Sequence, residues 1–206
     1  EVSLNVGYRG GAGVIMDVKT GEIIALTNYP EYSSEVLSTG TDKETIEGYS
    51  KDIGKPYMNK VVLGRYTPGS IVKPFVALAA LAEGVIDPLK SIYSSGSISI
   101  PNPYYPELKS TFYDWKAHGY VDMRRAIAVS SDVYFYEISG GFEDQKGIGI
   151  ANIDKYSKIF AIGEQTGINV PEEASGVIPT PEWKSKVFKG DAWRVGDTYN
   201  TSIGQY

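Results

Sequence analysis

The 206-residue sequence contains no cysteine and one histidine. The absence of cysteine excludes disulfides, thiolate metal sites and a thiol nucleophile. Positive charge is also limited, because 20 Lys and Arg against 25 Asp and Glu give a net charge of −5, and no basic run stands out. Nucleic acid is therefore not expected as a partner. No stretch approaches the roughly 18 apolar residues of a membrane span.

The remaining composition is that of a globular protein, with 42% apolar and 22% charged residues. These shares are ordinary for a soluble domain. The length suits one domain or part of a larger one. The sequence has no internal repeat and no low-complexity linker, so we expect residues 1–206 to belong to one domain.

Turn residues and apolar patterns predict the main elements. Residues 12–29 read as a β-hairpin, and residues 30–58 as loop with one short helix. Residues 70–84 are apolar on almost every face, which is typical of a buried helix, and Gly84 ends it. Residues 91–113 read as loop or short strands.

The second half is predicted to be helical and then irregular. Residues 121–139 read as helical at both ends with Ser-Ser-Asp in the middle, and residues 152–162 as a further short helix. From Gly163 onward the sequence is rich in turn residues, and we expect it to wrap the surface.

The stretch Thr67–Phe75, TPGSIVKPF, places Ser70 and Lys73 one turn apart at a helix start. Residues three apart lie on one helix face, so the amine can reach the hydroxyl. The free N–H groups and the positive dipole end of a helix start favour negative charge on the oxygen. A lysine held in a dry pocket can then act as the base for a serine nucleophile. The competing interpretation is a helix cap followed by a solvated lysine.

Ser130-Ser131-Asp132 is the second candidate element, followed by the aromatic run from Val133 to Tyr136. A serine with an aspartate two residues later can relay a proton and present a polar side chain to a cleft. On its own, the triplet is also a common helix start.

Together the two elements resemble the transpeptidase domain of penicillin-binding proteins, whose signature is S-x-x-K with S-D-N and K-T-G. The resemblance extends over nearly the whole chain. Its last parts, GEQTGINVPEEASGVIPTPEWK and GDTYNTSIGQ, are most similar to the class B, cell-elongation type. It implies an α+β penicillin-binding and serine β-lactamase-like fold, in which helices flank an antiparallel sheet.

The resemblance also implies the role of each site residue. Ser70 would be the acylated nucleophile. Its backbone N–H would supply half of the oxyanion hole. Lys73 would take its proton, and Ser130 would pass protons between Lys73 and the leaving amine. Asp132, where the family has Asn or Asp, would contact substrate or Lys73. No cofactor and no metal are implied.

The third motif is missing from its expected place. Lys19-Thr20-Gly21 precedes the nucleophile and reads as the turn of the hairpin rather than as the catalytic triplet. No K-T-G or similar triplet follows Asp132. We therefore expect residues 1–206 to be the N-terminal part of a transpeptidase domain, without the later strands of its sheet.

The implied function is D,D-transpeptidation of D-Ala-D-Ala stem peptides in peptidoglycan crosslinking, with β-lactams as substrate mimics. Two alternatives remain: a β-lactam sensor or β-lactamase-like protein, and a non-catalytic fragment. The expected partners are the stem peptide, β-lactams and, for the intact protein, a membrane glycosyltransferase. The expected location is the outer face of the cytoplasmic membrane, with an anchor outside this chain.

Three further residues carry weaker predictions. His118 is more consistent with a turn or a cleft side than with a metal site, since no second His and no Cys accompany it. Trp115 is expected to pack, and Tyr66 either to pack or to line the cleft.

Overall fold

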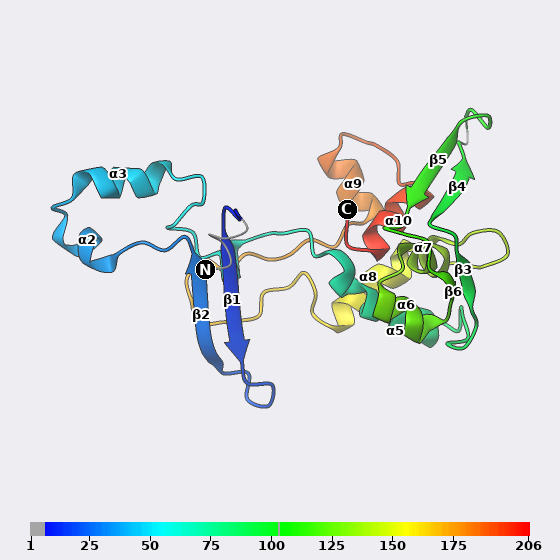
Figure 1. The fold of residues 1–206 in the computed structure, drawn as a ribbon, viewed down its shortest axis with the longest axis horizontal. Coiled ribbons are helices and arrows are strands. Elements are labelled where there is room, and N and C mark those ends of the chain that lie inside the picture. The colour runs from blue at the N-terminus through cyan, green and yellow to red at the C-terminus, as the bar shows by residue number, and fades with distance from the viewer. Residues whose placement is uncertain (1–6, 103) are drawn as a thin grey trace. The chain divides into compact units, whose positions relative to one another are not determined.

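A computed structural model describes residues 7–102 and 104–206 of the chain. The chain divides into two compact units (Figure 1). Unit 1 comprises the chain up to Tyr66 together with Gly167–Ser175, and unit 2 comprises Thr67–Thr166 together with Gly176–Tyr206. The assignment of residues 1–206 to one partial domain stays a prediction, and each unit is described by itself.

Unit 1 contains the predicted hairpin. Strands β1 (Gly11–Met16) and β2 (Ile23–Tyr29) pair antiparallel, which confirms the hairpin. Asp17 closes the turn, because its Oδ1 accepts the N–H groups of Lys19 at 2.8 Å and Thr20 at 2.9 Å. The Lys19-Thr20-Gly21 triplet therefore lies in the hairpin turn, as predicted.

Among the described residues of unit 1, three short helices follow the hairpin: α2 (Ser34–Thr39), α3 (Lys43–Lys51) and α4 (Lys60–Leu63). The prediction of one helix in residues 30–58 was wrong, because both α2 and α3 lie there. The side chains of Ser33 and Asp42 each accept an N–H of the first turn and so start a separate helix.

Unit 2 begins with the nucleophile segment and is mainly helical. Its helices are η1 (Gly69–Val72, a 3₁₀ turn), α5 (Lys73–Ala82), α6 (Met123–Val129), α7 (Asp132–Gly140), α8 (Gly149–Ile159), α9 (Pro181–Val187) and α10 (Val195–Ser202). Its strands are β3 (Ile92–Ser94), β4 (Ser97–Pro101), β5 (Lys109–Tyr113) and β6 (Gly119–Val121). The pairs β3–β6 and β4–β5 are antiparallel, so the α+β class is confirmed.

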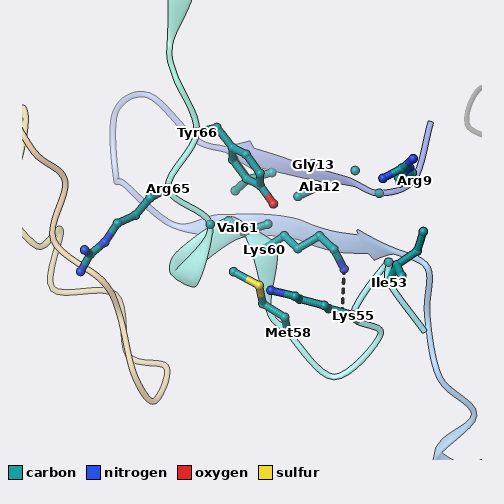
Figure 2. Close-up of a pocket in the computed structure, with 15 residues that line it drawn as sticks. Arg9, Ala12, Gly13, Ile53, Lys55, Met58, Lys60, Val61, Arg65 and Tyr66 are labelled. Carbon is teal, nitrogen blue, oxygen red and sulfur yellow. Dashed lines mark hydrogen bonds between the residues drawn. The ribbon is translucent and has the colours of Figure 1, made fainter. Parts of the chain in front are cut away.

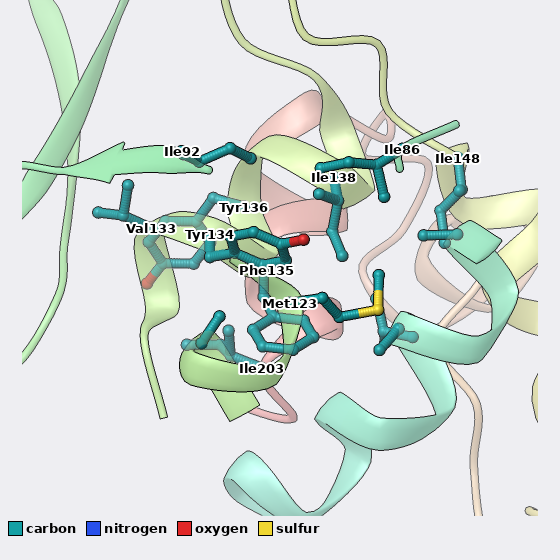
Figure 3. Close-up of a cluster of buried hydrophobic side chains, with 14 of the residues drawn as sticks. Ile86, Ile92, Met123, Val133, Tyr134, Phe135, Tyr136, Ile138, Ile148 and Ile203 are labelled. Carbon is teal, nitrogen blue, oxygen red and sulfur yellow. The ribbon is translucent and has the colours of Figure 1, made fainter. Parts of the chain in front are cut away.

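Helix α7 forms the centre of the core of unit 2 (Figure 3). Val133, Tyr134, Phe135 and Ile138 are each 0% exposed. The helix packs against α5, α8 and α10. A helix that is apolar all round must be covered on every side, and the aromatic run provides that surface. The start of α7, where Ser130 and Asp132 lie, is therefore attached to the buried core of the unit.

Helices α9 and α10 lie in the part of the sequence expected to be irregular. Thr180 caps α9, and Pro181 occupies its first turn. Lys184 of α9 is 5% exposed, and its Nζ lies 2.7 Å from Oδ2 of Asp197 in α10. This buried ion pair joins two segments that local turn signals alone describe as loop.

Glu137 makes the stability of unit 2 depend on pH. Burial, followed by the charge of Glu143, raises its pKa from 4.5 to about 7, and Lys90 partly opposes this. Its contribution to stability is fully present below about pH 4.5 and is lost as pH rises through about 7. We expect Glu137→Gln to raise the unfolding temperature at pH 8. The variant should also lose less stability than wild type as pH rises from about 4.5 to about 7.

Thermal unfolding from pH 4 to pH 8 measures this effect. Glu182→Gln, at an exposed position of α9, is the control. If the unfolding temperatures of Glu137→Gln and wild type fall in parallel as pH rises, Glu137 is not the group that causes the pH dependence.

Candidate active site

A tight turn presents Ser70 to solvent. Gly69 has φ of +64°, and its N–H donates to the carbonyl oxygen of Gly204 at 2.9 Å. Ser70 follows within η1, is exposed, and its carbonyl accepts the N–H of Lys73. The sequence predicted one helix from residue 70, whereas a 3₁₀ turn precedes α5. Pro74 lies in the first turn of α5, where its missing N–H costs little.

Lys73 lies beneath this turn and is 1% exposed. Its Nζ donates to the carbonyl oxygen of Ser130 at 2.9 Å, to Ser130 Oγ at 3.0 Å and to Asp132 Oδ1 at 2.5 Å. The three acceptors match the three N–H bonds of an ammonium group. The ring of Phe135 lies 5.5 Å from Nζ and adds a cation–π contact. The competing interpretation of Lys73 as a solvated side chain is therefore wrong.

Ser130 connects the lysine to the exposed serine. It adopts a left-handed conformation (φ 55°, ψ 45°) where α6 ends, and Ser131 caps the start of α7. Its Oγ donates to Ser70 Oγ at 2.8 Å while accepting from Lys73 Nζ. All four predicted residues therefore lie together, and hydrogen bonds link Lys73 to Ser70 through Ser130. The roles assigned to them stay predictions.

Asp132 is the charge partner of Lys73. Burial raises the pKa of its carboxyl, and the hydrogen bond and charge of Lys73 oppose that increase. The charge of Asp114 raises the pKa further, and His118 lowers it. Asp132 therefore releases its proton less readily than an exposed aspartate, and its ionised form depends on Lys73.

Removing the Ser130 hydroxyl tests the link between Lys73 and Ser70. We expect Ser130→Ala to slow acylation by penicillin by roughly 10²- to 10⁴-fold, the usual cost of losing a positioned proton-transfer group. The rate of formation of the covalent adduct measures it. Ser185→Ala, exposed on α9, is the control. A Ser130→Ala rate within threefold of wild type would show that protons reach Ser70 by another route.

Sequence reasoning missed the residues below this motif. Ser94, Ser131 and the side chain of Asp114 are all 0% exposed and hydrogen-bonded to one another. From the sequence, no role was assigned to Asp114. A buried aspartate has no local sequence signal, because its partners come from segments distant along the chain.

The weaker predictions have mixed outcomes. His118 lies in the turn between β5 and β6, where its buried ring packs edge-on against Trp115 at 5.0 Å. The turn prediction is confirmed for His118. Trp115 is 61% exposed, with its ring against His118 and the Lys116 ammonium group, so its packing role stays a prediction. Tyr66 lines a hollow in unit 1 instead of packing.

That hollow has a volume of about 800 Å³ (Figure 2). Lys60 points along it, and its Nζ donates to the carbonyl oxygen of Lys55 at 3.0 Å. Burial lowers the pKa of Lys60, and the charge of Asp52 opposes this. None of the four predicted site residues lines this hollow.

In residues 7–102 and 104–206, no group of three or more His, Cys, Asp and Glu side chains could hold a metal ion. Over the same residues, no helix is long and apolar enough to cross a membrane.

Comparison with known proteins identifies the family. The family model for the penicillin binding protein transpeptidase domain matches residues 11–205. Peptidoglycan D,D-transpeptidase MrdA of Acinetobacter baumannii is 35% identical over 205 residues, which is 98% of this chain and 29% of that protein. MrdA of Escherichia coli is 33% identical over 98% of this chain and 30% of its own length. The chain thus spans about a third of the curated relatives it matches.

Solved structures agree with this assignment. Penicillin-binding protein 2 of Helicobacter pylori, in complex with MreC, has a TM-score of 0.84 and 32% identity, covering 99% of this chain and 36% of that one. Penicillin-binding protein 2 of Pseudomonas aeruginosa, in complex with WCK 5153, has a TM-score of 0.80 and 30% identity, covering 98% and 43%. The resemblance to the cell-elongation type is confirmed by the relatives named MrdA. The chain therefore belongs to the transpeptidase domain family of the penicillin-binding proteins.

Proposed function

We propose that this chain carries the nucleophile half of a serine D,D-transpeptidase that crosslinks peptidoglycan and is acylated by β-lactams. The observation that supports it best is the series of hydrogen bonds from Lys73 through Ser130 to Ser70. It combines an exposed nucleophile with a buried amine and a hydroxyl between them, which is the arrangement an activated serine needs. Family membership and the relatives' names support the same reaction.

In the proposed reaction, Ser70 Oγ attacks the carbonyl carbon of the penultimate D-Ala of a stem peptide. With Lys73 neutral, the two hydrogen bonds run in the reverse sense, from Ser70 Oγ to Ser130 Oγ and from Ser130 Oγ to Lys73 Nζ. The Ser70 proton then moves to Ser130 as Ser130 releases its own to Lys73. The C–N bond to the terminal D-Ala then breaks, and the leaving nitrogen takes a proton back through Ser130. The amine of a second stem peptide attacks the resulting ester, forms the crosslink and restores Ser70.

Asp132 has a supporting role in this proposal. Its carboxylate, 2.5 Å from Nζ, holds the lysine below the hydroxyl of Ser130 and stabilises the ammonium formed when the proton arrives. The N–H of Ser70 would supply half of the oxyanion hole. Both are properties of this chain's own residues and need no cofactor.

The partners and location follow from the same proposal. One structural relative is a complex with MreC, and another belongs to a study of polymerization and crosslinking by a peptidoglycan synthase complex. We infer that the intact protein works with a polymerising membrane glycosyltransferase. Its stem-peptide substrate places it on the outer face of the cytoplasmic membrane, held by an anchor outside this chain.

Release of D-alanine from a synthetic peptide ending in D-Ala-D-Ala tests the proposed reaction. We expect release by the wild-type chain and none by Ser70→Ala. A peptide ending in L-Ala-L-Ala is the matched control substrate. Stable acylation by penicillin without any D-alanine release would favour a β-lactam-binding module and contradict the transpeptidase proposal for this chain.

A further inference from the structure

Asp114 lies directly after β5 as a buried acceptor with several donors. Its Oδ2 accepts from Ser131 Oγ at 2.9 Å, from the N–H of Val133 at 3.0 Å and from Ser94 Oγ at 3.2 Å. Its Oδ1 accepts the N–H of Trp115 at 2.8 Å. A carboxylate that accepts several N–H and O–H groups can stay charged when buried.

These hydrogen bonds join three segments that are distant along the chain. Ser94 ends β3, Asp114 begins the turn between β5 and β6, and Ser131 caps α7. Ser131 Oγ also lies 3.0 Å from Ser94 Oγ, which is an alternative acceptor for its single proton. The carboxylate lies at the start of α7, where a negative charge stabilises the helix dipole.

The same contacts surround the proton-transfer serine. Ser130 is the left-handed residue immediately before Ser131, so fixing Ser131 and the N–H of Val133 fixes the turn that carries Ser130. The turn has its own backbone bonds, since the N–H of Ser131 donates to the carbonyl of Ala126 at 2.9 Å. These bonds hold the backbone from the α6 side, and Asp114 holds it from the α7 side.

We propose that Asp114 is a positioning residue for the reaction, and that it holds Ser130 Oγ between Lys73 Nζ and Ser70 Oγ by anchoring Ser131 and Val133. This inference rests on the proposed function of Ser130. The hydrogen bonds of Asp114 reach Ser94, Trp115, Ser131 and Val133 rather than Ser70 or Lys73, so it acts through the turn and through its charge.

Asp114→Asn tests the proposal with little change in shape. An asparagine has one acceptor oxygen, so it can serve either the three donors on Oδ2 or the N–H of Trp115, but not both. We expect penicillin acylation to fall by roughly 10- to 100-fold, because small misplacements of reacting groups carry costs of that size. Asp144→Asn, exposed in the loop after α7, is the control.

A pH profile of acylation separates positioning from general loss of stability. The groups whose charges act on Asp132 are Lys73 of α5 with Asp114 and His118 of the β5–β6 turn, and Tyr136 lies further along α7. Removing the Asp114 charge lowers the pKa of Asp132, so we expect the acid limb of the profile to move to lower pH. A purely structural role would lower the rate without moving that limb.

Amide hydrogen exchange gives a readout that does not need activity. We expect the N–H groups of Val133 and Tyr134 to exchange faster in Asp114→Asn, while those of Ala79 and Ala80 in α5 stay protected. If Asp114→Asn does not fold, Ser131→Ala is the second variant, because it removes the hydrogen bond from Ser131 to Asp114 and keeps the carboxylate. We then expect faster exchange at the same two amides, with a smaller effect from Ser94→Ala.

Two results would overturn the proposal: unchanged exchange at Val133 and Tyr134 in the folded variants, or faster exchange with an unchanged rate and pH profile of acylation. If penicillin never acylates the wild-type chain, the proposed function is contradicted instead, whatever the exchange rates of the variants. The two failures are therefore distinguishable.

Discussion

Lys73→Met should reduce acylation by penicillin by about 10³-fold or more while the chain stays folded. Methionine is unbranched and one heavy atom shorter than lysine, so it fills most of the same buried space without the amine. The variant removes both the proton acceptor and the cation that three acceptors surround. The effect should be on acylation rate rather than on fold, because a positioned base contributes up to about 10⁴-fold. The rate of adduct formation, followed by mass spectrometry, measures it.

A double variant separates the chemical cost from the electrostatic one. In Lys73→Met, Asp132 loses its ion-pair partner, and we expect a stability loss of about 1–3 kcal/mol, limited because the carboxyl can take up a proton. Adding Asp132→Asn removes that charge and should restore most of the stability without restoring acylation. Acylation by Lys73→Met within tenfold of wild type would show that Lys73 is not the base.

Gly204→Ala should distort the turn at Gly69 and Ser70, although Gly204 is distant from that turn in the sequence. A Cβ at Gly204 would lie 2.4 Å from the carbonyl oxygen of Gly69 and 2.7 Å from its nitrogen, and φ at this position is +68°. Both neighbouring atoms are backbone, so the turn itself must move. We expect a stability loss of about 3 kcal/mol or more and a fall in acylation of roughly 10²-fold. Chemical denaturation and the rate of adduct formation measure these effects.

Gly84→Ala is the matched control for this variant. Gly84 has φ of +64° at the end of α5, and a Cβ there has nothing within 4 Å. Its substitution therefore carries only the left-handed backbone strain, about 1–2 kcal/mol, and should leave acylation unchanged. Equal effects of the two substitutions would show that the contact between Gly69 and Gly204 does not shape the site.

The parts of the site that the sequence predicted are those with local signals. Ser70 and Lys73 follow a Pro-Gly turn, and Ser130 to Asp132 interrupt two helical patterns. The hairpin was equally predictable, because Asp17 and Gly21 form its turn within a few residues of each other. In each case the residues that determine the structure lie beside the residues they affect.

The parts that the sequence did not predict depend on distant contacts. The 3₁₀ turn at Ser70 is bonded to Gly204, at the other end of unit 2, so a helical pattern from residue 70 gave no sign of it. Helix α10 begins with a capping arrangement of Arg194 and Asp197 in a stretch otherwise rich in turn residues. The buried carboxylate of Asp114 exists only because Ser94, Ser131 and Val133 meet it in the folded chain.

The most direct test of the account is the mass of the chain after incubation with penicillin. The account predicts a stable mass increase equal to one intact penicillin, located by proteolysis on the peptide that contains Ser70 and absent in Ser70→Ala. Unreacted wild-type chain, shown to be folded by circular dichroism, would contradict the claim that Lys73 and Ser130 activate Ser70 here. An adduct on any other residue would contradict the assignment of the nucleophile.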